Sequence, residues 1–158
     1  DQNKINLGKA TDQAVINGDD STSIQQKASG TIGAVLIVED NLVIQRMLTD
    51  YLQFHGYEVF CSDNGKEALD ICQSRKPNVV LMDIQIPGVD GLEVIRTIRN
   101  LRGESSSVPI IALTALAMQE HRKRCLEAGA DEYMSKPVDL ICLLNLIKKM
   151  SEKENDQI

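Results

Sequence analysis

The sequence predicts an α/β fold built on a doubly wound, five-stranded parallel sheet with five helices. From residue 34 onward, five short apolar runs alternate with five amphipathic stretches of helical period. The first run is apolar without interruption, as in strands that are covered on both faces. Parallel neighbours require crossover connections, and these are right-handed, so we expect helices on both faces of the sheet.

The first strand and helix set the pattern for the rest of the chain. Residues 34–38 form an apolar run rich in β-branched side chains, and Glu39 follows it. Asn41 stands where a side chain can cap the next helix, which Gly56 ends. The apolar side chains of this helix recur at helical spacing: Val43, Met47, Leu48, Tyr51 and Leu52.

The same unit repeats four more times. The predicted strands lie at residues 57–61, 79–82, 108–113 and 132–134, and the predicted helices lie near residues 64–74, 90–101, 117–128 and 138–150. The last helix carries a core stripe of Leu140, Leu143, Leu144, Ile147 and Met150. Ile141, Cys142 and Leu146 lie off that stripe, and they indicate either a broad buried face or a homodimer contact.

Composition excludes several classes of function. Apolar residues make up 42% of the chain and charged residues 25%, which is ordinary globular usage. The net charge of -6 argues against direct nucleic acid binding, since a polyanion recruits cations. No apolar run approaches the roughly 18 residues that a membrane span needs. The N-terminus lacks a signal-peptide pattern, so we expect a cytoplasmic segment without membrane contact.

The chain divides into three parts. Residues 1–33 are polar and follow no sustained apolar period, so they are predicted to be a linker or leader. Residues 34–150 form the predicted domain, and residues 151–158 form a polar C-terminal tail. The first residue is Asp1 rather than Met, which suggests a piece of a longer protein.

The candidate functional residues all follow predicted strands. Glu39 and Asp40 follow the first strand, Asp83 the third, Thr114 the fourth and Lys136 the fifth. In doubly wound folds the ligand site lies at the carboxyl ends of the strands, so these side chains are expected at one edge. Three crowded carboxylates repel each other unless a cation joins them, and an oxygen-only ligand set selects a hard ion such as Mg²⁺.

The pattern at this edge points to phosphoryl chemistry. Magnesium commonly binds through one or two carboxylates together with a phosphate oxygen. Asp83 emerges from an apolar strand into a loop and is the candidate nucleophile, because a carboxylate can attack phosphorus to give an acyl phosphate. Lys136 can neutralise charge, the Thr114 hydroxyl can bond a phosphoryl oxygen, and Tyr133 can swing inward as the loop after Thr114 moves.

Taken together, these motifs resemble the response regulator receiver family of two-component phosphorelays, over roughly residues 34–150. The motifs are Glu39-Asp40, Asp83 with Ile86-Pro87-Gly88 and Asp90-Gly91, Thr114-Ala115 and Lys136-Pro137. The resemblance implies a flavodoxin-like sheet of order 2-1-3-4-5. It also implies a phosphohistidine donor on a histidine kinase or histidine phosphotransfer protein. The domain would then catalyse its own phosphorylation and dephosphorylation.

The resemblance also assigns a role to each site residue. Asp83 would be the phosphoacceptor, and Glu39, Asp40, Asp83 and the main-chain carbonyl of Gln85 would bind Mg²⁺. Thr114 and Tyr133 would form the switch, and Lys136 would bind phosphate, with a cis bond to Pro137. Gln85 and Leu116 would flank the path of attacking water and tune the lifetime of the phosphoryl group.

Alternative functions remain open. The polar leader and the absent initial Met favour the C-terminal receiver of a hybrid histidine kinase over a stand-alone single-domain regulator. A Mg²⁺-dependent phosphohydrolase of the haloacid dehalogenase type would also form an aspartyl phosphate. Such enzymes are expected to carry a second aspartate two residues after the nucleophile, where this chain has Gln85. A receiver-like module that works without phosphorylation is disfavoured by the complete acidic set.

Overall fold

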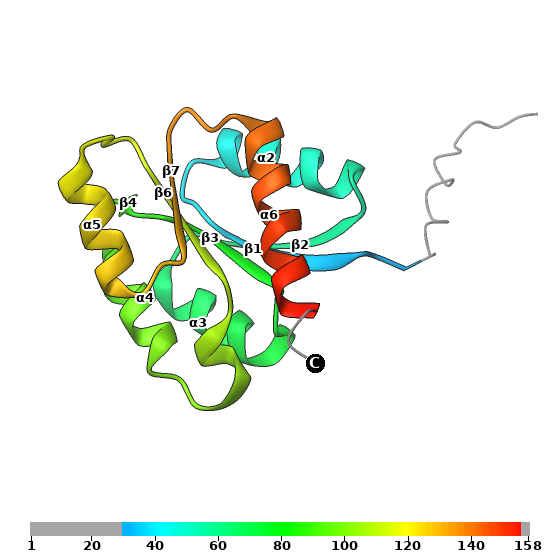
Figure 1. The fold of residues 1–158 in the computed structure, drawn as a ribbon, viewed down its shortest axis with the longest axis horizontal. Coiled ribbons are helices and arrows are strands. Elements are labelled where there is room, and N and C mark those ends of the chain that lie inside the picture. The colour runs from blue at the N-terminus through cyan, green and yellow to red at the C-terminus, as the bar shows by residue number, and fades with distance from the viewer. Residues whose placement is uncertain (1–29, 156–158) are drawn as a thin grey trace, which may run out of the picture. The chain divides into compact units, whose positions relative to one another are not determined.

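The computed structural model describes residues 30–155. The predicted leader therefore lies almost wholly outside the described residues. The described chain forms a five-stranded parallel sheet of order β2-β1-β3-β6-β7, which confirms the predicted fold class (Figure 1). Its strands are β1 (Gly33–Val38), β2 (Tyr57–Ser62), β3 (Val79–Asp83), β6 (Ile110–Thr114) and β7 (Glu132–Ser135).

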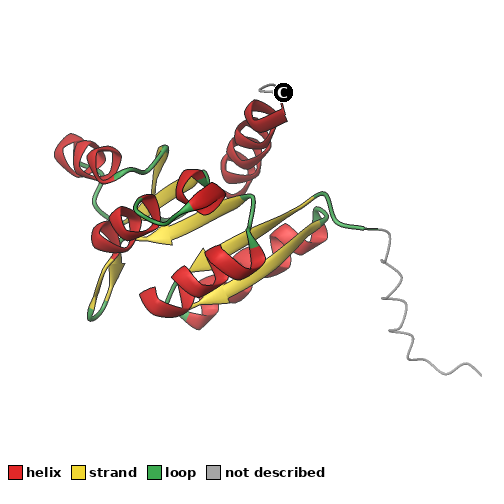
Figure 2. Ribbon diagram, turned by 90° about the horizontal axis from the view of Figure 1, so that it is seen from below, coloured by secondary structure: helices red, strands yellow, loops and turns green. Residues whose placement is uncertain are grey.

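Four of the five α-helices in the described chain connect these strands and the fifth follows β7, and the helices cover both faces of the sheet, as Figure 2 shows. They are α2 (Leu42–Phe54), α3 (Gly65–Arg75), α4 (Gly91–Arg99), α5 (Gln119–Ala128) and α6 (Leu140–Asn155). One apolar cluster unites α3, α4 and α5 with one face of the sheet, and a second unites α2 and α6 with the other face.

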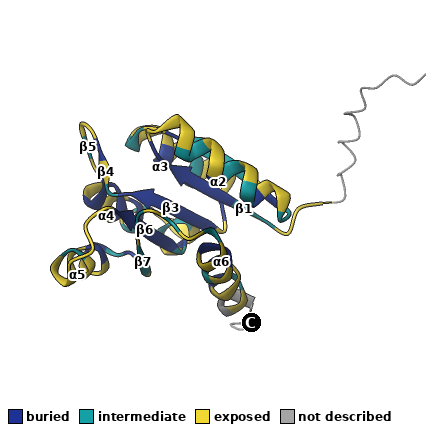
Figure 3. Cartoon of the chain, turned by 90° about the horizontal axis from the view of Figure 1, so that it is seen from above, coloured by how far each residue is buried: buried dark blue, intermediate teal, exposed yellow. Residues whose placement is uncertain are grey.

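Burial of the central strands explains why their sequences are apolar throughout. Residues 35–38 of β1 and residues 79–82 of β3 are completely buried, because helices pack on both faces of these strands. Figure 3 shows these strands in dark blue between helices whose outer surfaces are exposed. Glu39 follows the first of these buried strands and Asp83 ends the second, so both carboxylates lie at the carboxyl edge of the sheet.

Helix α2 begins as predicted but does not bury the whole predicted stripe. The side chain of Asn41 accepts hydrogen bonds from the N–H groups of Val43 and Ile44, which confirms the cap. Leu48 and Leu52 are buried, whereas Val43 is 78% exposed. Leu42 and Met47 are exposed too, so the first turns of α2 present an apolar surface beside the carboxyl edge of the sheet.

Several smaller elements and boundaries differ from the prediction. A two-stranded antiparallel hairpin, β4 (Gln85–Ile86) with β5 (Val89–Asp90), follows β3, and a 3₁₀ helix, η2 (Gly103–Ser107), precedes β6. Strand β6 begins at Ile110 and α5 at Gln119, each two residues later than predicted. Helix α6 continues to Asn155, so residues 151–155 are helical rather than part of a tail.

The off-stripe residues of α6 do not form a broad buried face. Ile141 is 68% exposed and Cys142 is exposed, whereas Leu146 is half-buried and packs against the core. The helix buries Leu143, Leu144, Ile147 and Met150 as predicted, and Leu140 is only partly buried. Helix α6 therefore buries only the stripe of side chains that packs against the sheet.

Candidate functional site at the carboxyl edge of the sheet

Glu39 is fixed at the end of β1 by its backbone. Its N–H donates to the carbonyl of Ser62 over 2.9 Å, and its own carbonyl accepts from Gln45 Nε2 over 3.0 Å. The side chain is 2% exposed, although it is a carboxylate. Asp40 follows it and is exposed, so the acidic pair offers one buried and one solvated carboxylate.

Asp83 closes β3 in the middle of the sheet. It pairs in register with Leu113 of β6, which places its carboxyl group between the ends of β1 and β6. The residue is 2% exposed, and its Oδ1 accepts a hydrogen bond of 2.9 Å from the N–H of Gln85. A buried carboxylate at a strand end needs such partners, because an unpaired buried charge is strongly unfavourable.

Lys136 joins the two buried carboxylates. Its Nζ lies 2.9 Å from Glu39 Oε1 and 3.0 Å from Asp83 Oδ2. The lysine follows β7, and its N–H donates to the carbonyl of Thr114 over 2.7 Å. The bond between Lys136 and Pro137 is cis, as the sequence resemblance implied.

The two carboxyl groups respond differently to this environment. Burial raises the pKa of Glu39 to about 7, its hydrogen bond with Asp83 adds to the rise, and Lys136 opposes it. Burial also acts to raise the pKa of Asp83, but hydrogen bonds with Glu39, Gln85 N–H and Lys136 outweigh it and hold that pKa below its ordinary value. Asp83 is thus the ionised partner.

Lys136 stays charged because the carboxylates outweigh its burial. Burial alone would lower its pKa, but the hydrogen bonds and charges of Glu39 and Asp83 raise it. One cation between two carboxylates leaves an acidic site with a surplus of negative charge when both are ionised. A further cation would relieve that surplus.

The acidic side chains come together as a possible metal site. Single oxygen atoms of Glu39, Asp40 and Asp83 all lie within 4.8 Å of one another. Such an oxygen-only donor set fits a hard divalent ion. Gln85 is next to this group, because its N–H bonds Asp83 directly, so the chain brings all four predicted metal-binding residues to one place.

Thr114 ends β6 beside Asp83 and carries a buried hydroxyl. It is 2% exposed, and its Oγ1 accepts a hydrogen bond of 3.0 Å from the N–H of Leu116. Among the described residues, the hydroxyl has no acceptor for its own hydrogen. A buried donor without an acceptor is uncommon and suits a site that receives an oxygen-rich group.

The loop between β6 and α5 is held from two sides. The hydroxyl of half-buried Tyr133 donates to the carbonyl of Leu116. The side-chain oxygen of Gln85 accepts from the N–H of Ala115 over 3.2 Å. The resemblance implied a switch role for Tyr133 and a place beside attacking water for Gln85, but neither bond was predicted, because nothing in the local pattern fixes the direction of a side chain.

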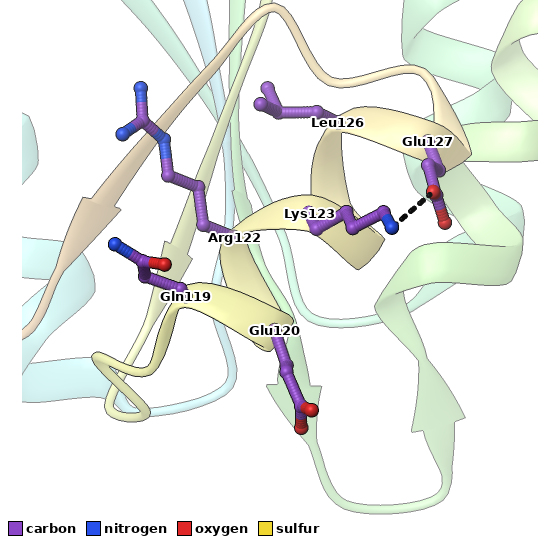
Figure 4. A pocket seen from close by; sticks show the side chains of 6 residues that line it. All are labelled: Gln119, Glu120, Arg122, Lys123, Leu126 and Glu127. Carbon is purple, nitrogen blue, oxygen red and sulfur yellow. Dashed lines mark ion pairs between the residues drawn. The ribbon is translucent and has the colours of Figure 1, made fainter.

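Helix α5 continues from this loop and carries the basic run of the sequence on its surface. Arg122, Lys123 and Arg124 are exposed and His121 is half-buried, so this run forms a solvated helix face. A shallow hollow of about 530 Å³ lies along the helix, and Figure 4 shows its lining side chains, with Lys123 paired to Glu127. This hollow is lined by α5 residues and includes none of the acidic-site residues.

Comparison with known proteins agrees with this geometry. Residues 35–148 match the family model of the response regulator receiver domain. The polar-differentiation response regulator DivK of Brucella anthropi is 38% identical over 115 residues, which are 73% of this chain and 93% of the relative.

None of the helices in the described part of the chain combines the length and the apolar character that a membrane span requires.

Two solved structures extend the comparison. The receiver domain of sensor histidine kinase PA1611 from Pseudomonas aeruginosa, with a magnesium ion in its active-site cleft, is 34% identical. It has a TM-score of 0.70 and the match covers 78% of this chain and 99% of that one. A chain of the Saccharomyces cerevisiae complex between Ypd1 and the Ssk1 receiver domain is 32% identical. Its TM-score is 0.71, and the match covers 77% of this chain and 90% of that one.

Proposed function

Because the chain belongs to the response regulator receiver family of two-component signalling, we propose that Asp83 is its phosphoacceptor. The observation that carries this proposal is the lysine bridge, in which Lys136 holds Asp83 and Glu39 at 3.0 and 2.9 Å. Together with the hydrogen bonds of Glu39 and Gln85 N–H, Lys136 holds the pKa of Asp83 below its ordinary value, and it places a positive charge where phosphoryl oxygens would gather. A nucleophile and its counter-charge are thus already in position.

The proposed reaction is a phosphoryl transfer from a phosphohistidine. A carboxylate oxygen of Asp83 forms a bond to phosphorus, and the bond between phosphorus and the imidazole nitrogen breaks. The electron pair leaves with the imidazole, which takes a proton from solvent. The loose transition state requires positioning and neutralisation of charge, and Lys136 supplies a cation at the carboxylate.

The donor set fits Mg²⁺, and we assign it to Glu39, Asp40, Asp83 and the main-chain carbonyl of Gln85. Three carboxylates meet within 4.8 Å, and burial raises the pKa of Glu39 to about 7. A divalent cation, when bound, would neutralise phosphoryl oxygens and restore the charge balance of the buried carboxylates. The related PA1611 receiver has magnesium in its active-site cleft, which supports this assignment.

Thr114 and Tyr133 are the proposed switch. The hydrogen of the Thr114 hydroxyl has no acceptor within residues 30–155, and Thr114 follows the strand partner of Asp83, so the hydroxyl can donate to a phosphoryl oxygen once one is present. Its Oγ1 also accepts from Leu116 N–H, and Tyr133 binds the Leu116 carbonyl. A movement of Thr114 toward a phosphoryl group would therefore be passed to the loop that begins α5.

The proposed partner is a histidine phosphotransfer protein or a histidine kinase. The exposed apolar side chains of Leu42, Val43 and Met47 lie on the first turns of α2, close to Asp40 in the chain. A donor must bring its histidine to the acidic edge, and this apolar surface offers contact area there. The similarity to the Ssk1 receiver, which was solved with the phosphotransfer protein Ypd1, supports such a partner.

We propose the receiver of a hybrid histidine kinase as the parent context, with a stand-alone regulator as the second candidate. Similarity to the PA1611 receiver favours the first, and similarity to DivK, most of which this chain covers, favours the second. In either case we propose that the domain acts in the cytoplasm, as is typical of receiver domains.

Intact mass after incubation with acetyl phosphate tests the proposed function. We expect one phosphoryl group to be added in the presence of Mg²⁺, and none after addition of a chelator. Asp83→Asn should abolish the adduct, whereas Asp70→Asn, which changes an exposed aspartate on α3, should retain it. An adduct of the same yield on Asp83→Asn would refute the assignment.

A further inference from the structure

The turn between β1 and α2 carries Glu39 and Asp40, and its backbone is anchored at two points. The Glu39 N–H donates to the carbonyl of Ser62 over 2.9 Å, which ties the turn to β2. The Glu39 carbonyl accepts from Gln45 Nε2 over 3.0 Å, which ties the peptide bond between Glu39 and Asp40 to α2. A third contact, from the Asn41 N–H to Glu39 Oε2, is long at 3.5 Å and stays within the turn. Among the described residues, Gln45 is therefore the external partner of that peptide bond.

Asp40 depends on this backbone because its side chain has no support of its own. The residue is exposed, and within residues 30–155 its carboxylate accepts no hydrogen bond. Even so, one of its oxygens lies within 4.8 Å of an oxygen of Glu39 and an oxygen of Asp83. Carboxylates that are this close repel each other when they are ionised. The orientation of the peptide bond before Asp40 therefore decides whether its carboxylate stays with the other two.

Gln45 is well placed to hold this peptide bond. Its own N–H donates to the Asn41 carbonyl over 2.9 Å, so its backbone belongs to the first turns of α2. The residue is half-buried, and its side chain reaches back six positions to the Glu39 carbonyl. The buried side chains of Leu48 and Leu52 pack the same helix against the sheet. The carboxamide therefore connects the turn to a helix that is itself held on the sheet.

We propose that Gln45 is a positioning residue that makes the acidic site selective for Mg²⁺ over the larger Ca²⁺. This role rests on the proposed function, which assigns a magnesium ion to the acidic site. Mg²⁺ requires near-ideal octahedral geometry, whereas Ca²⁺ accepts longer and less regular arrangements of oxygen ligands. Groups that orient metal ligands affect the affinity for the metal without touching it. A loosened turn therefore lowers the affinity for Mg²⁺ more than the affinity for Ca²⁺.

Replacing Gln45 separates the position of the ligands from their charge. Its side chain is neutral and bonds only a backbone carbonyl, so an uncharged replacement keeps every carboxylate of the site and the net charge of the chain. Loss of this one hydrogen bond should weaken Mg²⁺ binding by about two- to tenfold. Ca²⁺ binding should weaken by a smaller factor, because its ligand geometry is more tolerant.

Separate titrations with Mg²⁺ and with Ca²⁺ test the proposal. They follow backbone amide resonances of the full chain, including those of Asp40 and Gln85, and give a dissociation constant for each ion. Gln45→Met removes the amide and keeps the length of the side chain, whereas Gln45→Asn keeps the amide and shortens its reach by one methylene. Gln53→Met makes the first of these changes at an exposed position near the end of α2 and serves as the control.

The expected result is a change in the ratio of the two dissociation constants. Both Gln45 variants bind Mg²⁺ more weakly than wild type, and the ratio of the Mg²⁺ constant to the Ca²⁺ constant rises in both. Gln53→Met keeps the ratio of wild type. A merely structural role for Gln45 would lower the free energy of unfolding in urea and leave this ratio unchanged.

An unchanged ratio in both Gln45 variants would overturn the proposed selectivity, provided that wild type binds Mg²⁺. An equal rise of the ratio in Gln53→Met would also overturn it, because that side chain lies away from the turn. Absence of Mg²⁺ binding by wild type would instead overturn the metal assignment of the proposed function, and the role of Gln45 with it.

Discussion

The raised pKa of Glu39 predicts that the metal-free domain becomes less stable as pH rises. The ordinary pKa of 4.5 applies to the unfolded chain, and the folded value is about 7, so the folded state binds this proton more tightly. Glu39 is therefore neutral in the folded domain at pH 5 and must ionise while buried at pH 8. Its contribution to stability is present below pH 4.5 and is lost as pH rises through about 7.

The size of the effect follows from the shift. Each tenfold change in proton affinity corresponds to about 1.4 kcal/mol, so the loss between pH 5 and pH 8 should be on the order of 3 kcal/mol. Glu39 is 1% exposed, so solvent screens the effect little. A bound divalent cation should remove most of the loss, because it stabilises the ionised carboxylate.

Urea unfolding at pH 5 and pH 8, with chelator and with Mg²⁺, measures this effect. We expect Glu39→Gln to match wild type at pH 5 and to exceed its free energy of unfolding at pH 8 in chelator. Glu58→Gln, an exposed change on β2, corrects for the general titration of the protein. The reasoning is refuted if wild type and Glu39→Gln show the same pH dependence in chelator.

Three further substitutions test separate contacts. Lys136→Met should slow phosphorylation by acetyl phosphate about 100-fold, since one charged group at the reacting oxygens is lost. Intact mass against time measures it, and a rate close to that of wild type would contradict the role. Tyr133→Phe should lower the free energy of unfolding in urea by about 0.5–1.5 kcal/mol, because the bond to the Leu116 carbonyl is lost. An unchanged urea midpoint would show that this hydrogen bond does not stabilise the fold. Gly91→Ala should destabilise by about 1–3 kcal/mol, because its Cβ would lie 2.7 Å from the backbone Cα of Ile84. Thermal unfolding measures this effect, and an unchanged Tm would contradict it, because the backbone near Ile84 would then move aside without loss of stability.

The sheet and the edge position of the site could be predicted from sequence for the same physical reason. Strands β1 and β3 are buried on both faces, so their residues are apolar without interruption and the first polar residue marks the strand end. That residue is Glu39 after β1 and Asp83 at the end of β3. Because parallel strands point the same way, these ends share one edge of the sheet. Glu39 and Asp83, which are 44 positions apart in the chain, therefore both form ion pairs with Lys136.

The parts that escaped prediction depend on geometry that no local pattern encodes. The strands of the hairpin β4–β5 have two residues each, too few to show a period. The exposure of Val43 depends on how far the sheet extends beneath α2, which spacing alone cannot reveal. The bond from Ala115 to Gln85 joins two loops whose separation is set only by the finished fold.

Locating the phosphoryl group in the chain tests the central claim most directly. After incubation with acetyl phosphate and Mg²⁺, borohydride reduces an aspartyl phosphate to homoserine, and tandem mass spectrometry of the digested protein identifies the position. The account predicts homoserine at position 83 and at no other aspartate of the described chain. Homoserine at Asp40, or a phosphoryl adduct that leaves Asp83 unmodified, would contradict it.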